Sequence, residues 1–361
     1  MTEKEFIPSP YKIDVPSGKT TYKSPSNIAL VKYWGKKANQ IPANPSISFT
    51  LNECATVTTL TYSKLEKESK AFSFEVSLEG KKEEGFKPKI NTFFKRVYEY
   101  LPFLREYHFE IETSNSFPHS SGIASSASGM SALALCLMDI EKSLNPDMTV
   151  EFFNQKASFL ARLGSGSAAR SIKGSLVQWG EHAGIKGSSN LFGIEYPHKV
   201  HPVFQNYCDT ILLVDKGQKQ VSSTVGHDLM HGHPFAQQRF SQAHENLSKL
   251  ESIFASGDIK NFIAIVESEA LTLHAMMMTS QPYFILMKPN TLEIINKIWA
   301  FRESSKTHVC FTLDAGANVH VLYPENEKAQ VQQFIKDDLA SFCQNRQFIH
   351  DFIGNGARKI N

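Results

Sequence analysis

Apolar residues recur at helical spacing in four stretches of the chain. After Ser125 they follow a period close to 3.6, which predicts an amphipathic helix with one buried face, formed by Met130, Leu133, Ala134, Leu137 and Ile140. A second helix is predicted over residues 150–163, with Phe152, Phe153, Phe159 and Leu160 facing inward. Helices are also expected around residues 235–255 and 258–278.

Other stretches carry the pattern of β-strands. Alternating or β-branched residues predict strands over residues 26–31, 46–51, 56–61 and 210–214. Residues 308–313 and 318–323 have the spacing of a hairpin, and the charged stretch 64–89 is expected to be a hairpin or loop excursion. Sheets and helices together indicate an α+β fold.

Composition and charge narrow the possible functions. The chain has 361 residues, of which 41% are hydrophobic and 20% charged, as in a globular protein with a sizeable core. Its 38 basic and 36 acidic residues nearly cancel, so no broad positive field exists to hold a nucleic acid. An anionic ligand therefore needs a focused local site.

The cysteines and the apolar runs bear on location. Five widely spaced cysteines, without a Cys-x-x-Cys pair, are interpreted as buried thiols of a protein in a reducing compartment. The first residues lack the apolar core of a secretory signal, and no run reaches the roughly 18 apolar residues of a membrane-spanning helix. A cytoplasmic protein without a membrane partner is expected.

The clearest candidate for chemistry is the loop at residues 118–127, PHSSGIASSA, directly before the predicted helix. A helix N-terminus has free N–H groups and partial positive charge, so it favours phosphate. Gly122 permits close backbone approach, and Ser125 and Ser126 offer hydroxyls to phosphate or to Mg²⁺. The alternative is that these serines only cap the helix.

This loop resembles the Pro-x-x-x-Gly-Leu-x-Ser-Ser-Ala pattern of the GHMP kinase superfamily, with Ile123 at the Leu position. Three further segments are similar to mevalonate diphosphate decarboxylases in particular. They are NIALVKYWGK with NPSIS (residues 27–36 and 44–48), ARLGSGSAARS (161–171), and LDAGAN (313–318), in which Ala317 replaces a proline. With VSST at 221–224, the resemblance runs from about residue 25 to the C-terminal region.

The charged and hydroxyl residues of these segments suit a substrate that carries a diphosphate, a carboxylate and a tertiary hydroxyl. The planar fork of Arg170 can bind a carboxylate or phosphate, and Lys32 and Lys36 add point charges. Ser165 and Ser167 lie in a Gly/Ser loop that offers donors to the diphosphate. Taken singly, Arg170 and Lys36 also fit solvated surface charges, and Asp314 a turn residue.

The resemblance implies a two-domain GHMP kinase fold, with an N-terminal βαβ nucleotide-binding domain at 1–198 and a C-terminal ferredoxin-like domain at 199–361. It implies ATP-dependent decarboxylation of mevalonate 5-diphosphate to isopentenyl diphosphate in isoprenoid biosynthesis, with Mg²⁺ and a homodimer. The implied residues are catalytic Asp314, Lys32 and Arg170; substrate-binding Tyr33, Lys36, Ser165, Ser167, Arg170, Ser222 and Ser223; ATP-binding Gly122, Ala124, Ser125 and Ser126; and Mg²⁺-binding Ser125 and Ser126.

Alternatives remain open at this stage. A relative acting on mevalonate 5-phosphate or mevalonate, a 3-kinase without decarboxylation, or a non-catalytic binding protein would share most of these residues. Tyr33 also fits core packing. His227, His231 and His233 form a tempting metal cluster, but Gly232 and Pro234 interrupt it and no fourth ligand is evident.

Overall fold

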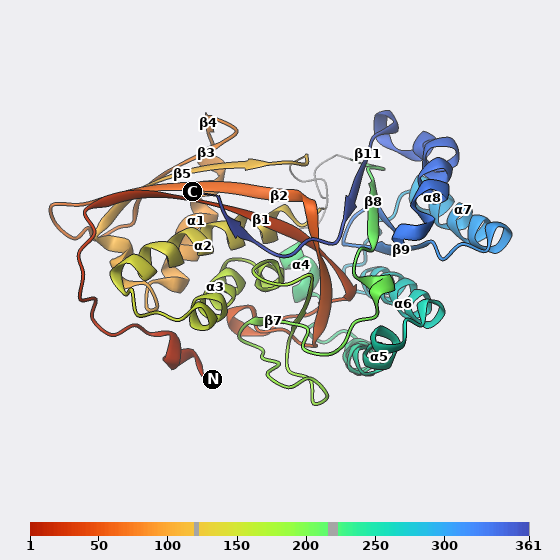
Figure 1. The fold of residues 1–361 in the computed structure, drawn as a ribbon, viewed down its shortest axis with the longest axis horizontal. Helices are drawn as coiled ribbons and strands as arrows, with labels where there is room; N and C mark the ends of the chain where they lie inside the picture. Colours follow the sequence, from red (N-terminus) through yellow and green to blue (C-terminus); the bar gives the residue numbers. More distant parts are fainter. Residues whose placement is uncertain (119–122, 216–222, 361) are drawn as a thin grey trace.

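The structure is a computed structural model that describes residues 1–118, 123–215 and 223–360. It is elongated, with a large twisted sheet at one end and a smaller sheet carrying several helices at the other (Figure 1). This two-sheet, mixed arrangement confirms the predicted two-domain α+β class.

The large sheet has eight strands, and two unusually long ones form its centre. Strand β1, Ser17–Val31, pairs antiparallel with β2, Ser46–Lys64, and the register shifts between Pro25 and Asn27. Pro25 lies opposite Ala55 and Asn27 opposite Thr50, so residues 51–54 of β2 interrupt the pairing with β1. The remaining strands are β3 Ser73–Leu78, β4 Lys81–Lys82, β5 Tyr107–Asn115, β6 Leu176–Trp179, β7 Gly193–Glu195 and β12 Arg358–Lys359.

Of two predictions for this region, one is wrong and the other is confirmed. The separate strands expected at 46–51 and 56–61 are one continuous strand, because β2 pairs with β6 at one end and with β5 at the other. The hairpin expected in the charged stretch 64–89 is confirmed by β3 and β4, which pair antiparallel, and β3 also joins the sheet parallel to β5. Apolar Phe74, Val76 and Leu78 alternate with polar residues along β3, although only Val76 is buried.

Three helices cover one face of the large sheet (Figure 1). They are α1 Lys87–Val97, α2 Ser125–Leu144 and α3 Val150–Gly164, the last two as predicted. Their inward faces pack into a core rich in phenylalanine, including Phe93, Phe94 and Phe159. Helix α2 packs against β1, β2 and α3, which places its N-terminus beside the centre of the large sheet.

The smaller sheet has four antiparallel strands in the order β11-β8-β10-β9. Its strands are β8 Cys208–Leu212, β9 Cys310–Leu313, β10 Val319–Tyr323 and β11 Phe348–Phe352. In chain order the spatial sequence is fourth, first, third, second, as expected for a ferredoxin-like unit. The predicted hairpin at 308–323 is confirmed as β9 and β10, which pair directly.

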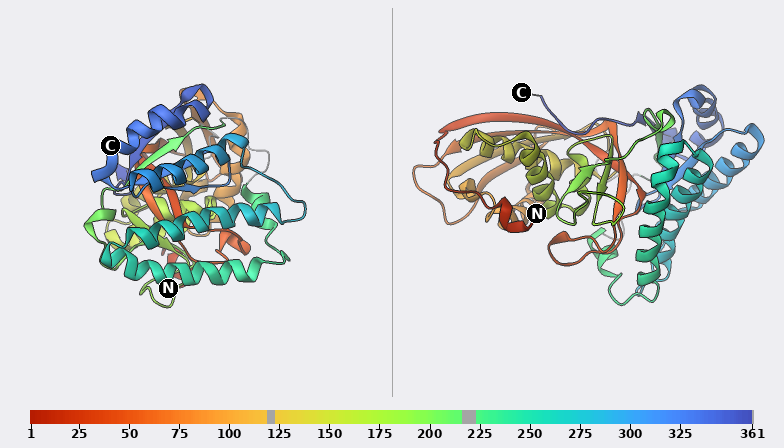
Figure 2. Two further views of the ribbon diagram at one scale, coloured as in Figure 1. Left: turned by 90° about the vertical axis from the view of Figure 1, so that its right-hand side faces the viewer. Right: turned by 60° about the horizontal axis from the view of Figure 1, so that its bottom comes forward.

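The helices of the second half stand beside this sheet, and two long ones run side by side (Figure 2). They are α4 Ser223–Asp228, α5 Ala236–Ser256, α6 Ile259–Met278, α7 Pro289–Ser305 and α8 Lys328–Phe334. Helices α5 and α6 confirm the prediction for residues 235–278. No helix in the described parts of the chain is long and apolar enough to cross a membrane.

The two halves share structure at their junction. One hydrophobic cluster contains Ile28 and Phe49 from the large sheet together with Ile211, Leu247 and Phe262 from the second half. The C-terminal strand β12 returns to pair with β1. The boundary predicted between residues 198 and 199 stays a prediction. All five cysteines are free and buried, which confirms their interpretation as buried thiols.

Candidate active site

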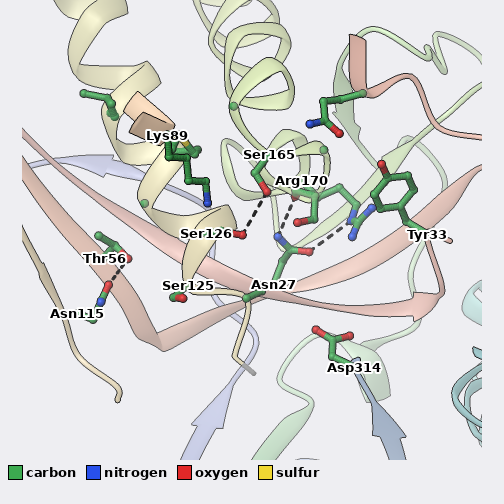
Figure 3. Close-up of a pocket in the computed structure, with 18 of the residues that line it drawn as sticks. Asn27, Tyr33, Thr56, Lys89, Asn115, Ser125, Ser126, Ser165, Arg170 and Asp314 are labelled. Atoms are coloured by element: carbon green, nitrogen blue, oxygen red, sulfur yellow. Dashed lines mark hydrogen bonds between the residues drawn. The ribbon is translucent and has the colours of Figure 1, made fainter. Parts of the chain in front are cut away.

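A cavity of about 700 Å³ opens between the large sheet, α2 and the second half of the chain. Figure 3 shows its polar part, where Arg170, Asn27 and Tyr33 lie across from Asp314. The cavity is lined by ten of the residues predicted from the sequence, namely Lys32, Tyr33, Lys36, Ala124, Ser125, Ser126, Ser165, Ser167, Arg170 and Asp314.

Three predicted residues are not tested by this geometry. Gly122 and Ser222 lie outside the described residues. Ser223 is the first residue of α4, and its side chain is likewise outside the description. Their assignments stay predictions.

Lys32 and Asp314 meet at the junction of the two halves. Lys32 directly follows β1 and Asp314 directly follows β9, so each side chain is held at the end of a strand. The Lys32 Nζ donates to Asp314 Oδ1 at 3.2 Å. The lysine side chain is 2% exposed and the aspartate 28%, so the carboxylate is the partner that faces the cavity. Burial lowers the pKa of Lys32, and the nearby Asp314 opposes that shift.

Behind Lys32 lies a sealed polar network from α5 and α6. Glu269 Oε2 accepts the Lys32 backbone N–H at 2.9 Å, and Arg239 Nη2 donates to the Lys32 carbonyl at 3.1 Å. Arg239 and Glu269 are themselves paired at 2.5 Å, and neither side chain is exposed. Asn44 Nδ2 also donates to the Lys32 carbonyl at 2.9 Å. The backbone of Lys32 is therefore anchored to the second half of the chain.

Helix α6 also contacts the other member of the pair. His274 Nε2 lies 3.2 Å from the backbone oxygen of Asp314 and donates to it. Burial lowers the pKa of His274 to about 4, with the hydrogen bond to Asp314 opposing the shift. One helix thus contacts the Lys32 backbone through Glu269 and the Asp314 backbone through His274.

Arg170 lies in a short 3₁₀ turn, Gly166–Ser171, and is 3% exposed. Its Nε donates to Asn27 Oδ1 at 3.3 Å and its Nη1 to Ser46 Oγ at 2.6 Å. Asn27 Nδ2 also donates to the Ser167 carbonyl and to Ser171 Oγ, which ties this loop to β1. Burial lowers the pKa of Arg170 to about 10. The guanidinium is fixed in place with donors left for a ligand.

The N-terminus of α2 has an open, strained start. Ala124 at the N-cap has φ 46° and ψ 37°, a left-handed conformation that is costly for alanine, and no side chain caps the helix. The alternative that the serines serve only as helix caps is therefore not supported among the described residues. Ser126 Oγ lies 3.3 Å from Ser165 Oγ, so the two Gly/Ser loops meet here. The start of α2 and the hydroxyl residues Ser125, Ser126 and Ser165 therefore lie on one wall of the cavity.

Tyr33 forms part of the wall beside Arg170. Its ring packs against Trp179 with centroids 4.7 Å apart, and its buried hydroxyl has no hydrogen-bond partner among the described residues. Gly166 makes this approach possible, because a Cβ there would lie 2.8 Å from the Tyr33 hydroxyl oxygen. An unpartnered buried hydroxyl in a cavity wall is available to a ligand.

The histidine cluster is dispersed. His227 lines the cavity, whereas His231 is exposed and His233 hydrogen-bonds the Met276 carbonyl. Within the described residues, no group of three or more His, Cys, Asp or Glu side chains is arranged to hold a metal ion.

Sequence reasoning missed several residues of the site. Asn27 stands inside a recognised motif and was open to identification as a polar residue in an apolar strand. Lys89 on α1 points toward Ser126 and Ser165 (Figure 3). Nothing local to its sequence marks it, because α1 itself was not predicted. An apolar arm of the cavity, missed for the same reason, is lined by Val76, Leu78, Phe86, Ile90, Ile111, Met130 and Leu133.

The fold and the site together define a protein of the GHMP kinase class. Two family models match the chain: the diphosphomevalonate decarboxylase-like N-terminal domain over residues 24–191, and the mevalonate 5-diphosphate decarboxylase C-terminal domain over residues 210–357. The chain belongs to the diphosphomevalonate decarboxylase family.

Individual relatives agree with this assignment. The chain is 28% identical over 342 residues to diphosphomevalonate decarboxylase mvd1 of Aspergillus fumigatus, covering 89% of this chain and 81% of the relative. The mevalonate diphosphate decarboxylase structure from Staphylococcus aureus is 28% identical, with TM-score 0.80 and coverage of 96% and 98%. The structure of MDDEF in complex with MVAPP, AMPPCP and magnesium is 27% identical, with TM-score 0.80 and coverage of 95% and 99%.

Proposed function

We infer that this protein decarboxylates mevalonate 5-diphosphate in an ATP-dependent reaction that yields isopentenyl diphosphate, ADP, phosphate and carbon dioxide. The observation that carries this is the Lys32–Asp314 pair at 3.2 Å, facing the same cavity as Arg170 and the N-terminus of α2. The reaction needs a carboxylate next to the substrate's C3 hydroxyl, a fixed guanidinium for the substrate's carboxylate, and an anion-binding helix N-terminus for the ATP phosphates. Asp314, Arg170 and α2 supply these three groups.

ATP is assigned to the α2 side of the cavity. The free N–H groups after Ala124 suit its phosphates, with Ser125 and Ser126 adding hydroxyls. The apolar arm beside α1 is the right environment for the adenine ring. The use of an ATP analogue and magnesium by a relative supports this assignment.

Magnesium fits the donors at this wall. Hydroxyl oxygens suit Mg²⁺, which keeps several waters and binds mostly substrate phosphates rather than a full protein cage. Ser125 and Ser126 are the residues that would hold it, and the ion would neutralise charge on the ATP phosphates.

Mevalonate 5-diphosphate is assigned to the opposite side. Arg170 would bind the carboxylate, while Lys36, Ser165, Ser167 and Tyr33 would bind the diphosphate. Asp314 then faces the C3 hydroxyl and accepts its proton as the C3 oxygen attacks the γ-phosphorus of ATP, with ADP leaving. Lys32, buried beside Asp314, keeps that carboxylate oriented and balances its charge.

Decarboxylation follows from the same arrangement. When the C3–O bond breaks, phosphate leaves with the bonding electrons and takes the proton that Asp314 had accepted. The ionised Asp314 carboxylate then stabilises the positive character that develops at C3. The electrons of the bond between C2 and the carboxylate carbon form the new C=C bond, and carbon dioxide is released. Arg170 holds the carboxylate in place until that bond breaks.

Turnover assays test the reaction and the substrate. Purified protein is incubated with ATP and each of mevalonate, mevalonate 5-phosphate and mevalonate 5-diphosphate, and ADP and carbon dioxide are both measured. We expect equal amounts of the two products with the diphosphate only. ADP without carbon dioxide would identify a 3-kinase, and preference for the monophosphate would overturn the substrate assignment.

We further propose a homodimer in the cytoplasm. The dimer rests on the resemblance to the family, and five unpaired buried thiols are consistent with a reducing compartment. Light scattering of the purified protein tests the homodimer. The mass of a monomer at micromolar concentration would contradict the homodimer. Fractionation of the producing cells tests the cytoplasmic location.

A further inference from the structure

His227 is held by three consecutive residues of the first half. Its ring lies between Tyr33 and Trp34, with centroid distances of 4.3 Å and 4.7 Å. The backbone N–H of Gly35 donates to His227 Nδ1 at 3.0 Å. The side chain is 9% exposed, so the imidazole has a defined orientation.

The fit around α4 is close, which explains that orientation. A Cβ on Gly226 would lie 2.6 Å from the Trp34 ring, so only glycine lets α4 approach this far. Asp228 Oδ1 lies 3.8 Å from Lys36 Nζ, which adds a second contact between α4 and the segment 33–36.

The hydrogen bond from Gly35 sets the tautomer. Because Nδ1 accepts the hydrogen bond from the Gly35 N–H, the proton of the neutral ring must be on Nε2, on the far edge of the imidazole. His227 lines the cavity, and no described residue hydrogen-bonds Nε2. One N–H donor is therefore directed away from the protein.

Charge keeps the ring in this form. Burial first, and then the positive charges of Lys36 and Arg170, together lower the pKa of His227 to about 3. A neutral imidazole cannot serve as an acid near neutral pH, and its Nδ1 is already occupied. What remains is a fixed, uncharged donor between two cations.

We propose that the His227 Nε2–H is a substrate-binding donor that contacts the diphosphate of mevalonate 5-diphosphate between Lys36 and Arg170. This rests on the proposed function. Arg170 lies next to Lys32 and Asp314, where the carboxylate and C3 must be, so the diphosphate extends toward Lys36 and α4. The neutral Nε2–H of His227 donates a hydrogen bond in one fixed direction, so it favours a phosphate oxygen at one position.

Three substitutions separate the two ends of the ring. His227→Gln keeps a donor near Nε2, His227→Asn keeps an acceptor near Nδ1 for Gly35, and His227→Phe keeps only the stacking. We expect the KM for mevalonate 5-diphosphate to rise roughly 10- to 100-fold in the Asn and Phe variants, with the KM for ATP unchanged. The Gln variant should recover most of that loss.

His231 supplies the matched control, because it is exposed, lies three residues after the end of α4 and does not line the cavity. His231→Phe should leave both KM values unchanged. Thermal unfolding of every variant identifies any that lose the fold. Should the Asn variant fold normally and bind substrate as tightly as the parent, the proposal fails.

A turnover-independent measurement separates this proposal from the proposed function. Inorganic diphosphate is titrated into the resting protein by calorimetry, and its binding should weaken by a similar factor in His227→Asn but not in His231→Phe. If the parent protein does not turn over mevalonate 5-diphosphate, the proposed function fails while this titration still decides His227. Equal diphosphate binding in the parent and the Asn variant overturns the inference alone.

Discussion

In the described part of the chain, Lys32 and Lys156 are each buried beside a carboxylate, and the two pairs differ in the exposure of that carboxylate. Lys156 on α3 pairs with Glu141 on α2 at 2.5 Å, and each side chain is 1% exposed. Lys32 pairs with Asp314 at 3.2 Å, with 2% and 28% exposed. Burial lowers the pKa of both lysines. In the first pair both partners are sealed, whereas in the second the carboxylate opens on a cavity.

That difference separates a structural role from a chemical one. A sealed pair can only stabilise or destabilise the fold, since nothing can reach it. An open carboxylate held by a buried lysine can meet a ligand without first breaking its pair. Residue type and burial of the lysine are therefore the same in both pairs, and the access of a ligand to the carboxylate is what distinguishes the candidate active site.

Replacing Asp314 is expected to have the largest effect. Asp314→Asn removes the proton acceptor and the charge facing C3, so turnover should fall about 10²- to 10⁴-fold with ATP binding retained. Coupled ADP assays and carbon dioxide release measure this, with nucleotide titration as the control. Turnover within a few-fold of the parent would remove Asp314 from the mechanism.

The sealed pair should behave in the opposite way. Lys156→Met leaves Glu141 buried without its partner, so the free energy of unfolding should fall by about 3–5 kcal/mol while kcat stays within about twofold. Urea unfolding gives the first quantity and steady-state assays the second. The double variant Glu141→Gln/Lys156→Met should recover most of the loss, and a persistent deficit would show that packing, not charge, is responsible.

The pH dependence of that variant has a defined sign. Burial raises the pKa of Glu141 and Lys156 opposes this, so removing Lys156 raises the pKa further. The folded variant then takes up a proton more readily than the unfolded chain. Its stability deficit should be full at about pH 8 and shrink toward about pH 5, as the pH falls through the raised pKa. A deficit that grows on acidification contradicts this.

Lys32 should limit activity on the alkaline side. Burial lowers its pKa below the ordinary value of 10.5, so kcat/KM should decline at a lower pH than an exposed lysine would give. Lys32→Arg should lose roughly 10- to 100-fold in turnover yet carry its alkaline limb to higher pH, because guanidinium stays charged. An unmoved limb would assign the decline to another group.

The smallest effect is expected at Tyr33. Its hydroxyl has no partner among the described residues, so Tyr33→Phe should leave thermal stability unchanged. If the hydroxyl binds substrate, the KM for mevalonate 5-diphosphate should rise by up to about tenfold. A drop in melting temperature with an unchanged KM would instead favour a purely structural role.

Local patterns predicted much of the fold. Helices α2, α3, α5 and α6 follow from apolar residues at helical spacing, and the β9–β10 hairpin follows from strand spacing. The same signal existed for α1, whose buried Ile90, Phe93, Phe94 and Val97 recur at three- and four-residue steps. It was masked by the charged residues around it. The hairpin of β3 and β4 was predicted, but not the parallel pairing of β3 with β5, because such a pairing joins segments far apart in the chain.

The candidate site was predicted in composition but not in arrangement. Lys32, Arg170 and Asp314 were named from motifs, each of which is local. No local pattern predicts that Lys89 points toward Ser126 (Figure 3). Nor does any local pattern predict that His227 contacts Tyr33, Trp34 and Gly35. These contacts join segments that are far apart in the chain, and the sequence of one segment does not indicate that it packs against the other.

Local patterns in the sequence predicted the buried sides of α2 and α3, a phosphate-binding loop before α2, and the motifs that the chain shares with its family. These depend on periodicity and on short stretches of backbone. Only the tertiary structure decided that Lys32 meets Asp314 across 282 positions, while Lys156 meets Glu141 out of reach of any ligand. The physical reason is that a charge's partner and its access to solvent depend on how distant segments pack, which no local pattern encodes.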